Sequence, residues 1–210
     1  MAHLVLPSFD RQLMEKHKIK VKSFYKDIFN QLKTNDIKTL VLDLRDNTGG
    51  RNEFAEDMVP FILKSENDTP YLKKTISWEG KEKIYDMPKA SKDVFSGKIF
   101  VLVNGRTYSA GSMLTRYLRE FAQATVIGEE TGTRYEGFAA GSKQFVTLSN
   151  SQLRIGIPRY HITFPPSEKQ TTSNRGLIPD YTVEYKIEDL IKERDLHLEK
   201  VHELIDSNAP

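Results

Sequence analysis

Apolar and polar residues follow two different periods along this chain, and together they predict an α/β fold. Some short runs are almost wholly apolar, which is typical of strands that helices cover on both faces. Other runs repeat apolar residues every three or four positions, which predicts helices. The predicted strands are 39–44, 98–103 and 125–128, and the predicted helices between and before them are 21–33, 53–64 (kinked at Pro60) and 110–124. Strands that alternate with helices pair in parallel, so we expect a mainly parallel sheet.

The remaining segments predict peripheral elements around this sheet. Leu4–Leu6 is typical of a short strand, and the polar excursion 65–97 is expected to hold a β-hairpin anchored by Trp78. A second hairpin is predicted over 143–158, turning at Ser149–Ser151. Periodic apolar residues predict one C-terminal helix over 186–206. We therefore expect a single domain over residues 1–210.

Composition narrows the class of protein. The chain has 210 residues, a net charge of +2 and scattered basic residues, which argues against a nucleic-acid or anionic-membrane partner. The sequence has no cysteine, which excludes thiolate chemistry, and we predict no cofactor or metal. No apolar run approaches the roughly 20 residues that span a bilayer, and the N-terminus does not have the pattern of a signal peptide.

Two loops follow the predicted strands 39–44 and 98–103, at the edge of a parallel sheet where ligand sites form. In NGRTYSAG, Ser109 precedes two small residues and opens a helix, as an exposed nucleophile requires. The N–H groups of Ala110 and of Gly49 or Gly50, in RDNTGG, are candidate donors for an oxyanion hole. The alternative for Ser109 is an ordinary helix cap.

The motifs VLDLRDNTGG, VLVNGRTYSAGS, VIGEETG and RGLIPD occur in this order over most of the chain. Their order and spacing resemble the tail-specific or C-terminal processing proteases, peptidase family S41. The resemblance implies a crotonase-like fold of stacked β-β-α units and a serine endopeptidase that acts on polypeptides. It also implies Ser109 as the nucleophile. Many members are exported bacterial proteins, which suggests a periplasmic or cell-envelope location, and many carry a PDZ domain.

The general base is where this chain departs from the family pattern. The bacterial branch uses a lysine 25 residues after the serine, and Arg134 stands there. Deprotonating an arginine near pH 7 costs about 7–9 kcal/mol, so Arg134 is not expected to be a base. The two alternatives for it are binding a substrate carboxylate and pairing with Glu129, Glu130 or Glu136. Glu120 occupies the place of an acidic residue on the nucleophile's helix, and a solvated surface charge is an equal alternative for it.

A second branch, which resembles the tricorn protease, takes its base from a histidine upstream of the first motif. The chain begins at its first strand, so we expect the upstream domain and any PDZ domain to be absent from it. His161, in RYHITF, is the histidine nearest to the later motifs. The chain is therefore predicted to lack its general base.

Two other functions stay open at this point. An inactive member would bind peptides through the same cleft, and an acyl-CoA enzyme would share the fold alone. In RGLIPD, Arg175 and Asp180 are expected to be structural residues that bracket a turn at Gly176 and Pro179.

Overall fold

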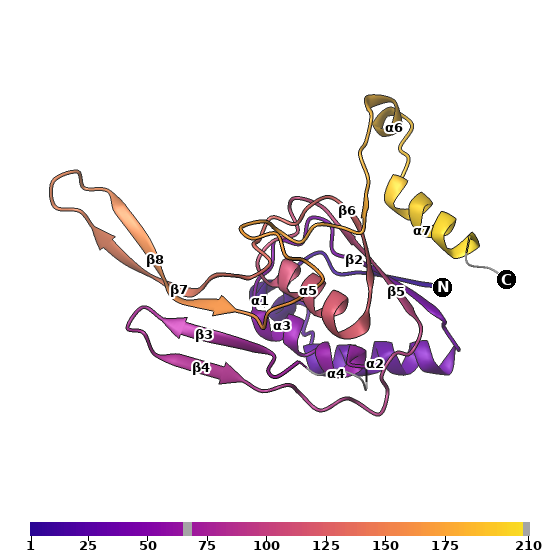
Figure 1. The fold of residues 1–210 in the computed structure, drawn as a ribbon, viewed down its shortest axis with the longest axis horizontal. Coiled ribbons are helices and arrows are strands. Elements are labelled where there is room, and N and C mark those ends of the chain that lie inside the picture. Colours follow the sequence, from indigo (N-terminus) through magenta and orange to yellow (C-terminus); the bar gives the residue numbers. More distant parts are fainter. Residues whose placement is uncertain (65–68, 208–210) are drawn as a thin grey trace.

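The computed structural model describes residues 1–64 and 69–207, and it contains a parallel and an antiparallel sheet (Figure 1). The elements in chain order are β1 (Ala2–Val5), α1 (Arg11–Lys16), α2 (Val21–Thr34), β2 (Thr39–Asp43), α3 (Asn52–Glu56), α4 (Val59–Ile62), β3 (Lys73–Ser77), β4 (Glu82–Tyr85), β5 (Lys98–Val103), α5 (Ala110–Ala122), β6 (Thr125–Gly128), β7 (Gly137–Thr147), β8 (Arg154–Thr163), β9 (Tyr181–Thr182), α6 (Ile187–Ile191) and α7 (Leu196–Asp206).

The predicted parallel sheet is confirmed. Its strand order is β1-β2-β5-β6-β9, and every neighbouring pair is parallel. The carboxyl ends of β2 and β5 therefore lie side by side, so the loops after Asp43 and Val103 emerge at one edge. This topology is what places the two candidate loops together.

Alternating residues of the central strands enter two different cores. Leu40 and Leu42 of β2 join a large apolar cluster with α2 and α5, and Tyr25 and Tyr117 are among its buried members. Val41 points to the opposite face and packs in a smaller cluster that includes Val201 of α7. Burial on both faces explains why these strands are continuously apolar.

The antiparallel sheet has the order β4-β3-β8-β7. The β3–β4 pair lies inside the predicted excursion, whose residues 65–68 fall outside the described part of the chain. Trp78 is 58% exposed, so its predicted role as an apolar anchor is wrong. The β7–β8 hairpin turns between Leu148 and Leu153, around the predicted position, and projects far from the body (Figure 1).

Two helix predictions need correction. The single C-terminal helix is in fact α6 and α7, because Glu193 has a positive φ of 51° and Asp195 caps the new helix by accepting from the Leu198 N–H. The kinked helix at 53–64 is instead two short helices. Pro60 lies in the first turn of α4, where its missing N–H costs nothing, rather than inside a longer helix.

Candidate active site

Ser109 has an unusual backbone conformation at the start of α5. Its φ is 53° and its ψ is −121°, a region that side chains other than glycine rarely occupy. A residue in such a conformation raises the free energy of the folded state by about 1–3 kcal/mol, so it persists only where the surrounding structure holds it. The Ser109 N–H donates to Thr133 Oγ1 at 2.6 Å, while its hydroxyl makes no capping bond to the helix. The geometry is therefore not that of an ordinary N-cap.

The loop after β2 that contains Gly49 and Gly50, called the glycine loop below, lies directly against Ser109. A Cβ built on Gly49, which has a φ of 89°, would lie 2.8 Å from the Cβ of Ser109 and from the Ala110 nitrogen. Real Cβ atoms do not approach so closely, so this position requires glycine. The two loops that were predicted to meet are thus in contact.

The candidate oxyanion donors differ in their availability. The Gly49 N–H already donates to the Asn47 side chain at 2.8 Å. Gly50 forms a parallel bridge with Phe9, in which Phe9 bonds the flanking residues Gly49 and Arg51. In such a bridge the central residue directs its own N–H away from the partner strand. The N–H of Gly50 therefore takes no part in the pairing with Phe9.

Asn47 is a site residue that sequence reasoning missed. Its side chain is fully buried, and its Nδ2 donates to the Leu6 carbonyl at 2.8 Å while its Oδ1 accepts from Gly49. Its own carbonyl accepts from the Tyr108 N–H at 2.9 Å. Asn47 therefore connects the end of β1, the glycine loop and the serine turn. Its place in DNTGG was the available signal, since an asparagine in a turn can donate and accept at once.

Arg45 connects the same loop to the C-terminal segment. Its guanidinium donates to Asp43 and, through both terminal nitrogens at 2.8 Å, to Asp195. Burial alone would raise the pKa of Asp195, but the hydrogen bonds from Arg45 and the Leu198 N–H, together with the charge of Arg45, lower that pKa overall. A half-buried ion-pair network thus holds the first residue before α7 against the end of β2.

None of the three candidate support residues, Arg134, Glu120 and His161, bonds Ser109 within the described part of the chain. Arg134 follows Thr133, but its side chain is 59% exposed and its nearest carboxylate is Glu136 at 3.7 Å. Glu120 lies near the far end of α5, about 16 Å along the helix, where it accepts from Ser167 and Tyr135. His161 is an exposed residue of β8, opposite Ala139. Among the described residues, no group of three or more acidic or histidine side chains could hold a metal ion.

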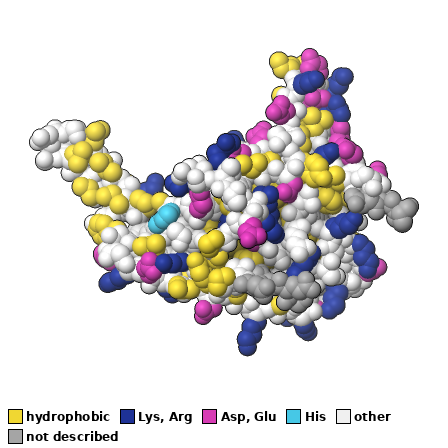
Figure 2. Space-filling view, viewed as in Figure 1, with side chains coloured by type: hydrophobic (Ala, Val, Ile, Leu, Met, Phe, Trp, Pro, Cys, Tyr) yellow, Lys and Arg dark blue, Asp and Glu magenta, His cyan; other side chains and the backbone are white. Residues whose placement is uncertain are grey.

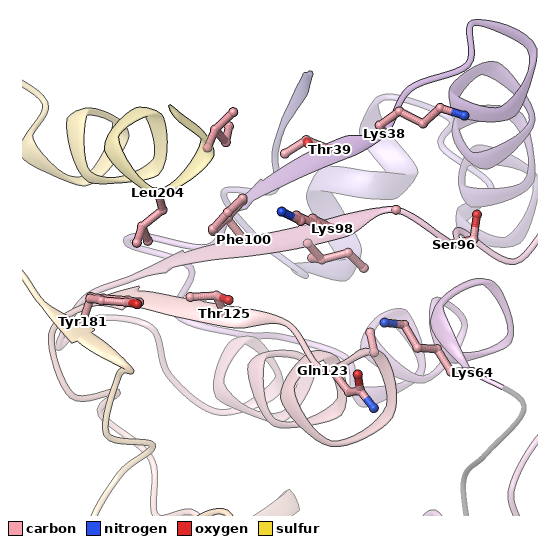
Figure 3. Close-up of a pocket in the computed structure, with 14 residues that line it drawn as sticks. Lys38, Thr39, Lys64, Ser96, Lys98, Phe100, Gln123, Thr125, Tyr181 and Leu204 are labelled. Atoms are coloured by element: carbon pink, nitrogen blue, oxygen red, sulfur yellow. The ribbon is translucent and has the colours of Figure 1, made fainter. Parts of the chain in front are cut away.

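Ser109 is not among the lining residues of two hollows in the surface. An open hollow of about 740 Å³ sits where β2, β5 and β6 begin, with Thr39, Lys98 and Thr125 in its lining (Figure 3). It is at the amino edge of the sheet, opposite the edge that carries the two loops. A smaller apolar hollow of about 210 Å³ is lined by Phe9 and Phe54, and it adjoins the glycine loop through the Phe9 backbone.

Comparison with known proteins decides the family. The model of peptidase family S41 matches residues 1–183. The chain belongs to peptidase family S41. Curated relatives of this S41 chain include a carboxy-terminal-processing protease of Bartonella bacilliformis, 29% identical over 193 residues, covering 89% of this chain and 40% of the relative. Another is the chloroplastic carboxyl-terminal-processing peptidase 2 of Arabidopsis thaliana, 29% identical over 140 residues, covering 66% and 25%.

The fold is shared with a solved photosystem II D1 C-terminal processing protease. The TM-score is 0.61 at 21% sequence identity, over 87% of this S41 chain and 42% of that protein. The chain therefore spans less than half of the length of each of these three proteins. No helix among its described residues is long and apolar enough to cross a membrane.

Proposed function

We propose that this S41 chain carries the nucleophile and oxyanion site of a serine endopeptidase of the C-terminal processing kind. The observation that carries the proposal is the conformation of Ser109. It has a positive φ, its hydroxyl makes no capping bond to α5, and it lies beside Gly49. In this scheme the Ser109 oxygen attacks a peptide carbonyl, and the N–H groups of Gly50 and Ala110 stabilise the oxyanion that forms. The helix dipole of α5 favours the same negative charge.

We propose further that this chain lacks its general base. The Arg134 guanidinium cannot accept the serine proton near neutral pH, and no titratable side chain bonds Ser109 within residues 1–64 and 69–207. Without a base the serine hydroxyl is a weak nucleophile, so little peptidase activity is expected from the 210-residue chain.

A fluorophosphonate probe tests the nucleophile. Labelling of the unmodified chain, even if slow, should vanish in Ser109→Ala. Ser112→Ala is the matched control, because Ser112 lies one turn further along α5 with its hydroxyl bonded to the Thr107 carbonyl. Equal labelling of the chain and its Ser109→Ala variant would refute the assignment.

Arg134→Lys tests the missing base. If the surroundings of residue 134 otherwise match those of the base lysine in the bacterial branch, Arg134→Lys should produce casein cleavage. The rate should increase toward alkaline pH, because the lysine must be deprotonated to act as a base. Robust Ser109-dependent cleavage by the unmodified chain would contradict the proposal, and His161 would then be the first residue to replace.

The second candidate is a member that binds peptides without cleaving them. Arg134 favours it, since the side chain at that position can pair with a substrate carboxylate but cannot act as a base. Binding of a polypeptide with no fluorophosphonate labelling and no gain from Arg134→Lys would select this function. The crotonase-like description of the fold is also a proposal, supported by the parallel order of the main sheet.

A further inference from the structure

The β7–β8 hairpin extends well beyond the body of the molecule, as an arm formed by residues 141–156. Every residue in this range is exposed. The strand β3 pairs with β8 only from Tyr160 to Thr163, so the arm has no neighbouring strand on either side within the described chain. Hydrophobic side chains gather along it in the space-filling view (Figure 2).

The pairing register places the arm's aliphatic residues on one face. Val146 lies opposite Ile155, and the next rung on that face is Leu148 with Leu153, joined by a 2.9 Å backbone bond. Residues opposite each other in an antiparallel pair share a face. These four side chains are 41%, 44%, 41% and 62% exposed, in the order given. The arm thus presents an apolar stripe that nothing in the described chain covers.

The other face and the flanks are basic. The Arg154 guanidinium stacks over Phe145 at 3.9 Å, and Lys143 and Arg159 are also exposed. The sequence has no aspartate or glutamate between Glu136 and Glu168. An acidic partner therefore complements the arm, whereas a second copy would bring like charges together. The surface area that four half-exposed aliphatic side chains can bury is also well below the roughly 800 Å² per partner that a stable dimer buries.

The strand β7 is an edge strand with unpaired backbone groups. Its pairing with β8 shifts register between Ala140 and Lys143 and is regular from there to Thr147. A polypeptide strand added to this edge would satisfy its N–H and C=O groups. A lipid surface would leave these backbone groups unsatisfied, at a cost of several kcal/mol each. The turn 149–152 at the tip of the arm is also polar, which argues against insertion into a membrane. The free edge of β8 is less suitable because Pro158 lacks an N–H.

The arm is also continuous with the candidate active site. Thr133, whose hydroxyl accepts the Ser109 N–H, precedes the start of β7 by four residues. At about 3.3 Å per residue, the regular part of the edge, from Lys143 to Thr147, lies roughly 20–35 Å along β7 from its first residue, Gly137. A chain held there would have to be long to reach Ser109 as well.

We propose that the arm is a docking surface for extended, acidic and apolar polypeptide segments, which add as a strand along the free edge of β7. Alternate side chains of the added strand lie beside Val146 and Leu148. This inference rests on the proposed function only in calling the bound polypeptide a substrate. It implies that the arm affects long unfolded chains and not peptides of a few residues.

Binding of fluorescein-labelled, reduced and carboxymethylated α-lactalbumin, measured by fluorescence anisotropy, tests the proposal. The Ser109→Ala chain is used throughout, so that cleavage does not interfere. Val146→Ser with Ile155→Ser should weaken binding at least tenfold. Ile187→Ser with Ile191→Ser is the matched control, since these α6 side chains are 73% and 75% exposed but lie far along the chain from the arm.

A second variant, Lys143→Glu with Arg154→Glu, keeps the apolar stripe and should also weaken binding, in case the first does not fold. Thermal melting establishes folding for each. Unchanged binding in folded arm variants would overturn the proposal. So would arm-dependent binding to vesicles of phosphatidylcholine and phosphatidylserine without polypeptide binding, or an arm-dependent dimer in light scattering. If the chain with Ser109 intact is not labelled by fluorophosphonate while the Ser109→Ala chain still binds through the arm, the proposed function is defeated and the arm's role stands.

Discussion

At the scale of single residues, the sequence identified Ser109 by its small neighbours but could not reveal its strain. The positive φ arises because the Thr133 hydroxyl, the glycine loop and α5 converge on this turn from different parts of the chain. Tertiary contacts of this kind leave no local pattern. The structure therefore adds an energetic property to a residue that the motif had already located.

Ser109→Gly should raise the free energy of unfolding by about 1 kcal/mol, because glycine adopts a positive φ without strain. The matched change Ser112→Gly should lower it by about 1–2 kcal/mol, since it places glycine in α5 and removes the bond to the Thr107 carbonyl. Urea denaturation followed by circular dichroism measures both. If the two changes destabilise equally, Ser109 is not strained.

Asn47→Ala should lower the free energy of unfolding by about 2–3 kcal/mol. It leaves the Leu6 carbonyl and the Gly49 N–H without partners inside the protein. Asn35→Ala is the control, because Asn35 is exposed after α2 and its amide donates to the Gln31 carbonyl one turn earlier, so its loss should cost less than about 1 kcal/mol. Equal effects in the same denaturation experiment would show that Asn47 does not organise the loops.

At the scale of elements, buried parallel strands and amphipathic helices were predictable because each carries its own period. The break between α6 and α7 was not, since the apolar positions continue through it, while the Asp195 cap and its bond to Arg45 depend on contacts that the local pattern does not show. The length and isolation of the arm also escaped prediction. Alternating apolar and polar residues predict a strand with one buried face. The pattern does not reveal that the apolar face of the arm is left exposed by the rest of the described chain.

The loop before β9 gives the element-scale prediction. Asp180 accepts from the Val126 N–H at 2.7 Å and from Arg119 at 2.9 Å, which ties this loop to β6 and α5. Asp180→Asn should therefore lower the free energy of unfolding by about 1–2 kcal/mol while polypeptide binding stays intact. Glu168→Gln, an exposed change nearby in the sequence, should leave both unchanged. Normal melting of Asp180→Asn with lost binding would reverse the assignment.

At the scale of the whole molecule, the order of motifs predicted the family and the parallel sheet, because both depend on elements that repeat a simple pattern. The identity of a base does not follow in the same way. It depends on one side chain reaching one hydroxyl, which no local pattern of apolar and polar residues reveals. The anchoring of α7 depends likewise on a few buried polar groups brought together from distant segments.

His197 provides the pH-dependent part of this anchoring. It is 3% exposed in α7, its Nδ1 lies 3.0 Å from the Tyr185 hydroxyl, and its Nε2 has no hydrogen-bond partner among the described residues. Burial, followed by the charge of Arg45, lowers the pKa of His197 from its ordinary value near 6.5. The carboxylates Asp195, Asp43 and Glu129 oppose this shift without reversing it.

The unfolded chain therefore binds a proton near pH 6.5 that the folded chain takes up only at lower pH. The stability that the neutral imidazole contributes is fully present above the unfolded-state pKa near 6.5, and it is lost as the pH falls from there through the folded-state pKa of His197. Urea unfolding at pH 7.5 and 5.5 should show this loss in the unmodified chain and in His202→Gln, an exposed change on the same helix. His197→Gln should be less stable at pH 7.5 but lose less on acidification. An identical pH dependence in all three would mean that His197 does not couple α7 to the sheet through its charge.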